Sequence, residues 1–319
     1  MPRVLIIYNP LAGRGRGKHF AQLTNYKLKQ QNWNVLGVIA TQHAGHAEKE
    51  IVPDWCQQVD IFVVVAGDGT LREVVTGLLN MKSTTSLGFV PLGNANVVAR
   101  EFGIPLNPVH AIDGIAGYEA RNADVGVCRF TNQTQCYFLA MVEVGQGARI
   151  VHLVDHLRHG TFKRLYRWWG DLVYVIACLM VLKNQNKVHF SVTVENHVQY
   201  EACQRAVFSC MATYSKGWSM TPDARFDDGK LDFVTSQRSG VIAFISQMLA
   251  SARRKKIRRS WVQYGIGERF EISSQIPMCI QADGDPVTES SSLQLEVIPS
   301  AYQILAPPSS APRGNRDGK

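Results

Sequence analysis

The sequence lacks any pattern of paired cysteines. Its seven cysteines stand at positions 56, 128, 136, 178, 203, 210 and 279, and no two of them have the Cys-x2-Cys spacing. An odd number of scattered cysteines excludes a disulfide scaffold, and the missing close pairs argue against a structural zinc site. We therefore interpret the cysteines as reduced thiols and expect a cytoplasmic protein.

Long apolar runs are also missing. The longest one, near residues 168–182, is interrupted by Gly170 and Asp171, so it falls short of the roughly 18 apolar residues of a membrane-spanning helix. The N-terminus enters the strand-like run VLIIY directly, without the basic region, apolar stretch and cleavage site of a signal peptide. We expect a protein that is not exported and contacts a membrane without spanning it.

The composition excludes a disordered chain. Hydrophobic residues make up 45% and charged residues 19% of the 319 positions, enough for two globular domains. The net charge of +8 suits an anionic partner such as a nucleotide, a nucleic acid or an acidic membrane surface. Charge alone does not choose among these partners.

Residues 1–122 alternate short aliphatic runs with segments of helical character. We predict buried strands at 4–8, 35–39, 61–65 and 87–90, and helices at 17–31, 45–57, 70–81 and 93–102. This alternation predicts a doubly wound α/β domain with a parallel sheet, whose ligands bind at the carboxyl ends of the strands.

The pattern changes after residue 122. Strand-like segments such as YFLAMVEVG, KVHFSVTVEN and KLDFVTS follow one another with turns between them. They predict a second, β-rich antiparallel domain over 123–293, interrupted by helices at 148–183 and 239–256. The polar, proline-rich tail 307–319 is expected to be disordered.

Three glycine-containing loops follow strands of the first domain. They read NPLAGRGRG at 9–17, AGDGT at 66–70 and PLGNANVVAR at 91–100, and the first lacks the Walker spacing Gly-x4-Gly-Lys-[Ser/Thr]. Asp-Gly is also ordinary turn chemistry. A buried strand followed by a glycine turn and a helix N-terminus nevertheless favours anion binding, and a doubly wound sheet brings such loops together.

These loops resemble those of the diacylglycerol-kinase catalytic-domain superfamily, which includes soluble bacterial lipid kinases and the sphingosine and ceramide kinases. The family's loops read Asn-Pro-x-x-Gly, Gly-Gly-Asp-Gly-Thr and Pro-Leu-Gly-Thr-Ala-Asn. DVG at 124–126, TPDARFDDGKLD at 221–232 and QADGDP at 281–286 are similar to its second-domain motifs. The resemblance implies an NAD-kinase-like nucleotide-binding domain, a β-rich lipid-binding domain, ATP in the cleft between them, and a strand at about 294–306 that returns to the first domain.

The resemblance also implies an ATP site made of four stretches. Its residues are Asn9, Pro10, Leu11, Ala12 and Gly13, then Thr41, then Gly67, Asp68, Gly69, Thr70, Leu71, Arg72 and Glu73, and finally Asn94. Asp68 is expected to act at the metal-phosphate end of the nucleotide.

Carboxylates of the second domain carry the remaining implied roles. Asp285 would accept the proton of the lipid hydroxyl, with Asp283 in support. Asp228 and the backbone carbonyls of Arg225 and Lys230 match the family's Mg²⁺ site, to which Asp124 would be linked. Phosphoryl transfer needs carboxylates to hold the metal and accept a proton. Without the resemblance, a hairpin turn is the preferred interpretation of DDGK.

Three positions depart from the family pattern. Ala66 replaces the first glycine of its loop, Asn94 replaces the usual threonine, and Val97 stands where many bacterial members carry an aspartate. Alanine fits where φ is negative, and asparagine still hydrogen-bonds a phosphate. Val97 is the larger change because it removes a carboxylate, although the sphingosine-kinase branch is similar in lacking that acid.

Three further segments have weaker interpretations. His152, His156 and His159 share one helix face and could bind a metal. The sequence shows no carboxylate or cysteine partner for them, so we interpret them as a polar helix face and assign no metal there. The basic run RRKKIRR at 253–259 fits a nucleic-acid patch or a solvated helix end, but its apolar neighbour VIAFISQML favours an acidic membrane surface. The segment at 162–182 fits a lipid channel, a bilayer contact or a buried core helix equally well.

Together these features predict an ATP- and Mg²⁺-dependent lipid kinase. It would phosphorylate a hydroxyl of a membrane lipid, diacylglycerol or sphingoid-like, while bound peripherally to an anionic membrane surface, and a homodimer is left open. NAD kinase, which shares the glycine-aspartate loop, is one alternative. A non-catalytic lipid- or nucleic-acid-binding module on a kinase frame is the other.

Overall fold

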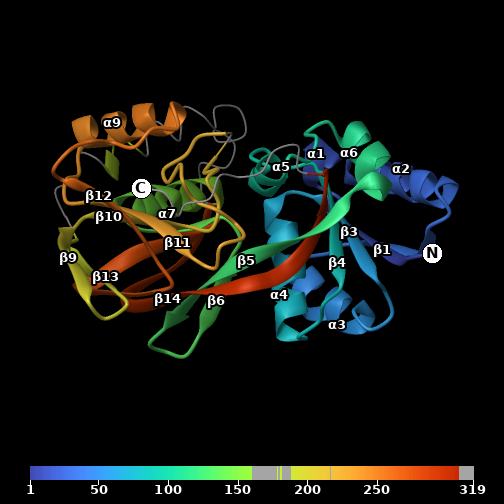
Figure 1. Cartoon of the computed structure of the whole chain (residues 1–319), viewed down its shortest axis with the longest axis horizontal. Helices are drawn as coiled ribbons and strands as arrows, with labels where there is room; N and C mark the ends of the chain where they lie inside the picture. The colour runs from blue at the N-terminus through green and yellow to red at the C-terminus, as the bar shows by residue number, and fades with distance from the viewer. Residues whose placement is uncertain (160–177, 179, 182–187, 216, 309–319) are drawn as a thin grey trace. The chain divides into compact units, whose positions relative to one another are not determined.

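The computed structural model describes residues 1–159, 178, 180–181, 188–215 and 217–308 (Figure 1). The chain divides into two compact units. Unit 1 comprises Met1–Asn122 and the C-terminal segment from Tyr302, and unit 2 comprises Ala123–Ala301. Most of the segment at 162–182 and the tail beyond 308 lie outside the described residues, as does much of the predicted helix over 148–183.

Unit 1 is built on a parallel sheet with the strand order β14-β4-β3-β1-β2. Its strands are β1 (Arg3–Tyr8), β2 (Asn34–Ala40), β3 (Ile61–Ala66), β4 (Ser86–Pro91) and the end of β14 (Asp285–Ala306). The β14 strand joins this sheet where Ile304 lies opposite Leu87. The central strand β3 is almost fully buried, as expected for a parallel sheet that helices cover on both faces.

The helices of unit 1 are α1 (Ala12–Gly15), α2 (Gly17–Gln30), η1 (Ala47–Ile51), α3 (Val52–Trp55), α4 (Asp68–Asn80), α5 (Val97–Phe102), α6 (Pro108–Gly114) and η2 (Ile115–Gly117). In Figure 1, α2 and α6 cover one face of the sheet, and α3 and α4 cover the other. Phe20 and Leu28 of α2 pack with Ile112 of α6 against Val63 and Val65 of β3. The apolar stripe of each helix is therefore buried on the sheet.

Two predicted helices of unit 1 differ from the observed ones. The segment 93–102 becomes helical only at Val97, because the preceding loop places Asn96 in the left-handed region with φ 47°. The segment 45–57 forms a π-helical turn followed by the short α3. Helix α6 was not predicted, although Asn107 caps it by accepting a bond from the Val109 amide at 3.0 Å, with Pro108 at its first position.

Unit 2 is dominated by antiparallel strands in the order β12-β11-β10-β7-β13-β14. Its strands are most of β5 (Glu119–Phe130), β6 (Gln135–Phe138), β7 (Met141–Gly145), β8 (Phe190–Val194), β9 (Val198–Cys203), β10 (Arg205–Ser209), β11 (Leu231–Ser236), β12 (Val262–Gly267), β13 (Arg269–Ala282) and most of β14. Its longer helices are α7 (Gln146–His159) and α9 (Val241–Ala252). Phe208, Phe233 and Phe270 pack edge to face or tilted in its core.

The predicted fold class, an α/β domain followed by a β-rich antiparallel domain, is confirmed. The last strand is longer than predicted: β14 begins at Asp285 and reaches Ala306. No helix within the described residues is long and apolar enough to cross a membrane.

Candidate active site and family

The three glycine-containing loops of unit 1 meet at the carboxyl ends of β1, β3 and β4. The Asn9 amide donates to Val65 O at 3.3 Å, the Leu92 amide to Ala66 O at 2.7 Å, and the Gly13 amide to Leu92 O at 3.0 Å. Thr41, which follows β2, donates its amide to Tyr8 O at 2.8 Å. The structure therefore brings the stretches assigned to ATP binding to one edge of the sheet.

Glycine is required where the first loop enters α2. A Cβ on Gly17 would lie 2.0 Å from Asn9 O, so no side chain fits there. Asn9 shapes the loop by accepting a bond from the Leu11 amide through Oδ1 at 2.9 Å. Gly13 and Arg14 follow with φ of 60° and 61°. The loop is thus held in shape by its own hydrogen bonds.

A second close approach forms a cradle at the N-terminus of α4. A Cβ on Gly67 would lie 3.2 Å from Gly93 Cα, and a Cβ on Gly93 would lie 2.9 Å from Gly67 Cα. Gly67 caps α4 with its backbone alone, because no side chain caps that helix. The buried Asn96 Oδ1, 2.8 Å from the place of a Gly93 Cβ, has no hydrogen-bond partner among the described residues. An uncapped helix N-terminus in such a cradle suits an anionic group.

Asp68 connects two of these loops. Its carboxylate accepts bonds from the Val97 amide at 3.1 Å and from the Val98 amide at 3.2 Å. These amides open α5, whose N-cap residue Asn96 supplies no side-chain bond. Asp68 therefore caps a helix from a distant loop, a structural role in addition to the predicted role at the metal-phosphate end.

In unit 2 the QADGDP motif is the hairpin that joins β13 to β14. Ala282 pairs with Asp285, leaving Asp283 and Gly284 as a two-residue turn with φ of 50° and 90°, the conformation for which Asp-Gly is selected. The Asp283 carboxylate accepts bonds from the amides of Leu139, Ala140 and Met141 at 2.8, 2.9 and 3.0 Å. Asp285 is exposed, so the anchored and the accessible carboxylate lie two residues apart.

Asp124 organises the other acidic turn of unit 2. Its buried carboxylate accepts bonds from the amides of Gly229 at 2.7 Å and Ser300 at 2.8 Å. Burial raises the pKa of Asp124, and the nearby carboxylates of Asp228 and Asp227 raise that pKa further. The turn therefore gathers negative charge that a bound cation would offset.

Two family models match the chain. The diacylglycerol kinase catalytic domain matches residues 3–128, and the YegS C-terminal NAD kinase beta sandwich-like domain matches residues 140–306. The chain belongs to the diacylglycerol kinase superfamily. It is accordingly a lipid kinase by family, and the predicted resemblance is confirmed.

Sequence similarity to known proteins extends over most of this kinase. The diacylglycerol kinases of Staphylococcus haemolyticus and Bacillus subtilis are 26% and 27% identical to it, and the matches cover 88% and 89% of this chain and 81% and 90% of theirs. The crystal structure of a diacylglycerol kinase from Bacillus anthracis is 19% identical with a TM-score of 0.70, covering 96% of this chain and 97% of the other. A second structure from that organism has 20% identity and a TM-score of 0.75. These structures share its fold.

The three departures from the family pattern have local structural contexts. Ala66 is the buried last residue of strand β3 and is not among the positions with positive φ, so its methyl group is tolerated. Asn94 is exposed. Val97 has a buried side chain and binds Asp68 through its amide. At position 97 the kinase keeps the backbone contact while lacking the carboxylate.

The Asp68→Asn variant is expected to lose at least about 10²-fold in kcat while keeping its circular dichroism spectrum. The variant retains one amide-accepting oxygen for α5 but loses its negative charge, and losing part of a cap costs only about 1 kcal/mol of stability. Turnover and thermal unfolding, each measured for the wild type and for Asp68→Asn, show whether activity is lost without loss of the fold. Near-normal turnover by the variant would remove Asp68 from the mechanism.

Unit 2 contains a buried polar network that was not predicted from the sequence. Glu143 and Arg205, 0% and 2% exposed, form an ion pair with Nε and Oε1 2.5 Å apart. Gln281 Nε2 donates to Glu143 Oε2 at 3.2 Å, and Gln247 Oε1 accepts from Arg205 Nη1 at 2.5 Å. The sequence offered two signals for this network. Glu143 lies within the apolar run FLAMVEV, and Arg205 directly precedes AVFSC. Charges rarely sit inside buried strands without a partner.

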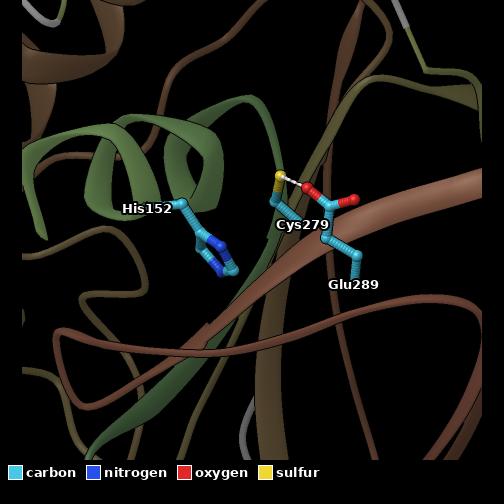
Figure 2. A group of neighbouring side chains, drawn as sticks. All are labelled: His152, Cys279 and Glu289. Carbon is cyan, nitrogen blue, oxygen red and sulfur yellow. Dashed lines mark hydrogen bonds between the residues drawn. The ribbon is translucent and has the colours of Figure 1, made fainter. Parts of the chain in front are cut away.

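The histidine helix does have neighbours that the sequence did not reveal. Figure 2 shows His152 of α7 beside Cys279 and Glu289, which face each other across β13 and β14. Their ligand atoms lie within 4.8 Å of one another. The prediction that His152 has no cysteine or carboxylate neighbour was therefore wrong. His152 Nε2 already contacts Ile280 O at 2.8 Å, and the Cys279 thiol donates to Glu289 Oε1 at 3.2 Å. All three residues therefore already have polar partners within the protein.

At pH 8 the Cys279 thiol is expected to react with iodoacetamide at a rate about 10²-fold or more below that of an ordinary exposed thiol. Burial, together with the hydrogen bond and charge of Glu289, raises the pKa of Cys279 to about 12. Glu289→Gln should lower this pKa and speed alkylation of Cys279, measured by mass spectrometry of the peptide. Glu271→Gln, elsewhere on β13, is the control, and equal rates in both variants would contradict the assigned cause.

Proposed function

We propose that this kinase transfers the γ-phosphoryl group of ATP to a hydroxyl of a membrane lipid, diacylglycerol or sphingoid-like, with Mg²⁺. The observation that supports ATP use most directly is the cradle at α4, where two loops touch through Gly67 and Gly93 beside the unpartnered Asn96 Oδ1. A side chain at either glycine would fill this space. Backbone amides and a helix N-terminus are what a phosphate group needs.

In this proposal the nucleotide is held by unit 1. Asn9 and Gly13 shape the first loop. Asp68, at the start of α4, holds the start of α5 next to it by accepting bonds from the amides of Val97 and Val98. Such fixed donors matter because phosphoryl transfer depends on positioning and charge stabilisation more than on covalent chemistry.

The Asp124 turn would hold Mg²⁺. Asp228 and the carbonyls of Arg225 and Lys230 would supply the oxygen ligands that Mg²⁺ prefers. The fit rests on geometry, because Asp124 accepts from the Gly229 amide at 2.7 Å and Asp228 from the Lys230 amide at 3.2 Å, so both carboxylates lie at one turn. When bound, the cation would neutralise negative charge during transfer.

Asp285 would accept the proton of the lipid hydroxyl. It is exposed at the first residue of β14, whereas both carboxylate oxygens of Asp283 accept backbone bonds. Asp283 would thus maintain the turn while Asp285 meets the substrate. A carboxylate helps late in such a reaction, when the attacking oxygen has become acidic.

The direct test is to incubate the purified protein with ATP labelled in its γ-phosphate and a total bacterial lipid extract. We expect label in a lipid that mass spectrometry identifies as a phosphate ester. Label in NAD, supplied in a parallel reaction, would establish NAD kinase instead. Lipid binding without ATP consumption would establish a binding module.

We also propose that the kinase binds anionic membranes through the basic run, residues 253–259. All six cations of the run are exposed. Lys256 pairs with Asp223 and Arg254 donates to Gly217 O at 3.1 Å. Changing Arg253, Lys255, Arg258 and Arg259 to glutamine therefore spares both internal contacts.

This fourfold glutamine variant is expected to bind anionic vesicles about 10-fold or more weakly than the wild type, because each basic residue near such a surface contributes about 1 kcal/mol. Wild-type binding should itself weaken as salt rises. Sedimentation with phosphatidylglycerol vesicles measures both effects, and activity on detergent-solubilised lipid serves as the control. Equal losses of binding and of detergent activity would instead indicate a folding or catalytic role.

A further inference from the structure

Helix α9 buries polar side chains and exposes large apolar ones, although its Phe244 is partly buried against Ile150. Ala243, Gln247 and Ser251 form its buried stripe, although two of the three are polar. Its outward stripe consists of Ile242, Ile245 and Leu249, which are 87%, 51% and 51% exposed. A helix on a water-facing surface normally buries its apolar side chains and exposes its polar ones. We call this outward stripe the α9 face.

The α9 face is continuous in sequence with the basic run. The helix ends at Ala252 and the cations begin at Arg253. Large apolar side chains followed by a cluster of cations match an anionic bilayer, because the apolar groups enter the lipid boundary while the cations meet the headgroups. A soluble acidic partner would complement the cations but would not require three exposed apolar side chains in a row.

The inward side of α9 begins a buried chain of hydrogen bonds, which we call the relay. Gln247 accepts from Arg205, Arg205 pairs with Glu143, and Glu143 accepts from Gln281. All four relay side chains are at most 5% exposed. Gln281 Oε1 then accepts from the Gly284 amide at 2.8 Å. The relay therefore runs from the helix that carries the α9 face to the turn between Asp283 and Asp285.

Movement within the relay is restricted by its buried charges. If the Glu143 and Arg205 side chains separated, each would be left charged and away from water, which is strongly unfavourable. Space for the Glu143 carboxylate depends on Gly147, where a Cβ would lie 1.6 Å from Glu143 Oε1. A displacement of Gln247 must consequently be followed by its relay partners or break a buried bond.

We propose that the α9 face is the bilayer-docking surface and that the relay makes Gln247, Arg205, Glu143 and Gln281 positioning residues for the Asp283–Asp285 turn. Seating α9 on an anionic membrane thereby orders the carboxylate that meets the lipid hydroxyl. The functional part of this inference rests on the lipid kinase function proposed above. The docking surface and the ordering of the turn are measurable without catalysis.

The first experiment tests the surface. Ile242→Ser combined with Ile245→Ser should reduce binding to phosphatidylglycerol-phosphatidylcholine vesicles by about 10-fold or more, since two large apolar groups no longer leave water. Ile276→Ser is the matched control, because Ile276 is 53% exposed on β13. Wild-type binding by the double variant, or equal losses in the control, would overturn the assignment of the α9 face.

The second experiment tests the relay by amide hydrogen exchange over residues 281–286, with and without the same vesicles. We expect vesicles to slow exchange in the wild-type turn about 10-fold or more. Gln247→Met removes the oxygen that accepts from Arg205 and should bind vesicles normally without slowing exchange in the turn. Gln247→Glu keeps an acceptor oxygen and should restore the response. An unresponsive wild-type turn, or a normal response in Gln247→Met, would overturn the relay.

A kinetic measurement then separates this inference from the proposed function. Anionic vesicles that contain no substrate lipid should raise the wild-type kcat on a water-soluble short-chain diacylglycerol. They should not raise the kcat of Gln247→Met. If the wild type phosphorylates no lipid, the proposed function fails while the exchange result still decides the relay. If kcat rises equally in both proteins, the relay fails while the kinase function stands.

Discussion

Asp285→Ala is expected to lower kcat by about 10²- to 10⁴-fold, the usual cost of removing a general base. The exposed carboxylate stands at the first residue of β14, beside a turn that Asp283 anchors with three backbone bonds. Removing the Asp285 side chain leaves that anchor intact, so the fold and the KM for ATP should change little. Steady-state kinetics on the best lipid substrate measure the effect.

Asp228→Ala is the matched control for Asp285→Ala. Because Asp228 lies in the proposed metal site, raising the Mg²⁺ concentration should recover part of this variant's activity and none of the activity of Asp285→Ala. Rescue of Asp285→Ala alone would mean that the two roles are exchanged. Both residue assignments would then be wrong.

Glu143→Ala is expected to lower the free energy of unfolding by about 3–5 kcal/mol, because it leaves the buried Arg205 charge without its partner. Arg205 is 2% exposed and pairs with Glu143 through Nε. Urea unfolding followed by circular dichroism measures the loss. Glu296→Ala is the control, since the exposed pair of Glu296 with Arg129 should contribute less than about 1 kcal/mol.

A double variant distinguishes the lost pair from the lost volume. Glu143→Leu combined with Arg205→Met removes both charges and keeps apolar bulk, so it should be more stable than Glu143→Ala. Its hydrogen exchange in the Asp283–Asp285 turn should nevertheless no longer respond to vesicles. Equal instability of the double variant and Glu143→Ala would show that packing, rather than charge, dominates at this position.

Unit 1 was predictable because its signals are local. The run IFVVVA is short and rich in β-branched residues, which predicts a buried strand, and the following GDGT opens a helix. Once the strands are parallel, their carboxyl ends share one edge of the sheet, and the loops must meet. The boundary error at Val97 arose because Asn96 adopts the left-handed conformation and delays the start of α5, and the conformation of a single loop residue is not given by helical periodicity.

The acidic turns were predictable as motifs but not as hydrogen-bonding groups. Asp-Gly predicts the hairpin at residues 283–284 from local chemistry alone. That Asp283 binds the amides at 139–141, and Asp124 those of Gly229 and Ser300, depends on strands that are distant in sequence. The different exposure of Asp283 and Asp285 follows from those contacts.

By itself, the sequence determined the fold class, the order of the motifs and the membership of a lipid kinase family, because hydrophobic periodicity and glycine turns act over a few residues. Only the tertiary structure decided which polar groups are buried together. Glu143 contacts Arg205, 62 residues away in the sequence, and Gln281, 138 residues away. The tertiary structure also decided that the apolar stripe of α9 faces outward. Side-chain burial and pairing depend on the packing of the whole unit, so no local pattern specifies them.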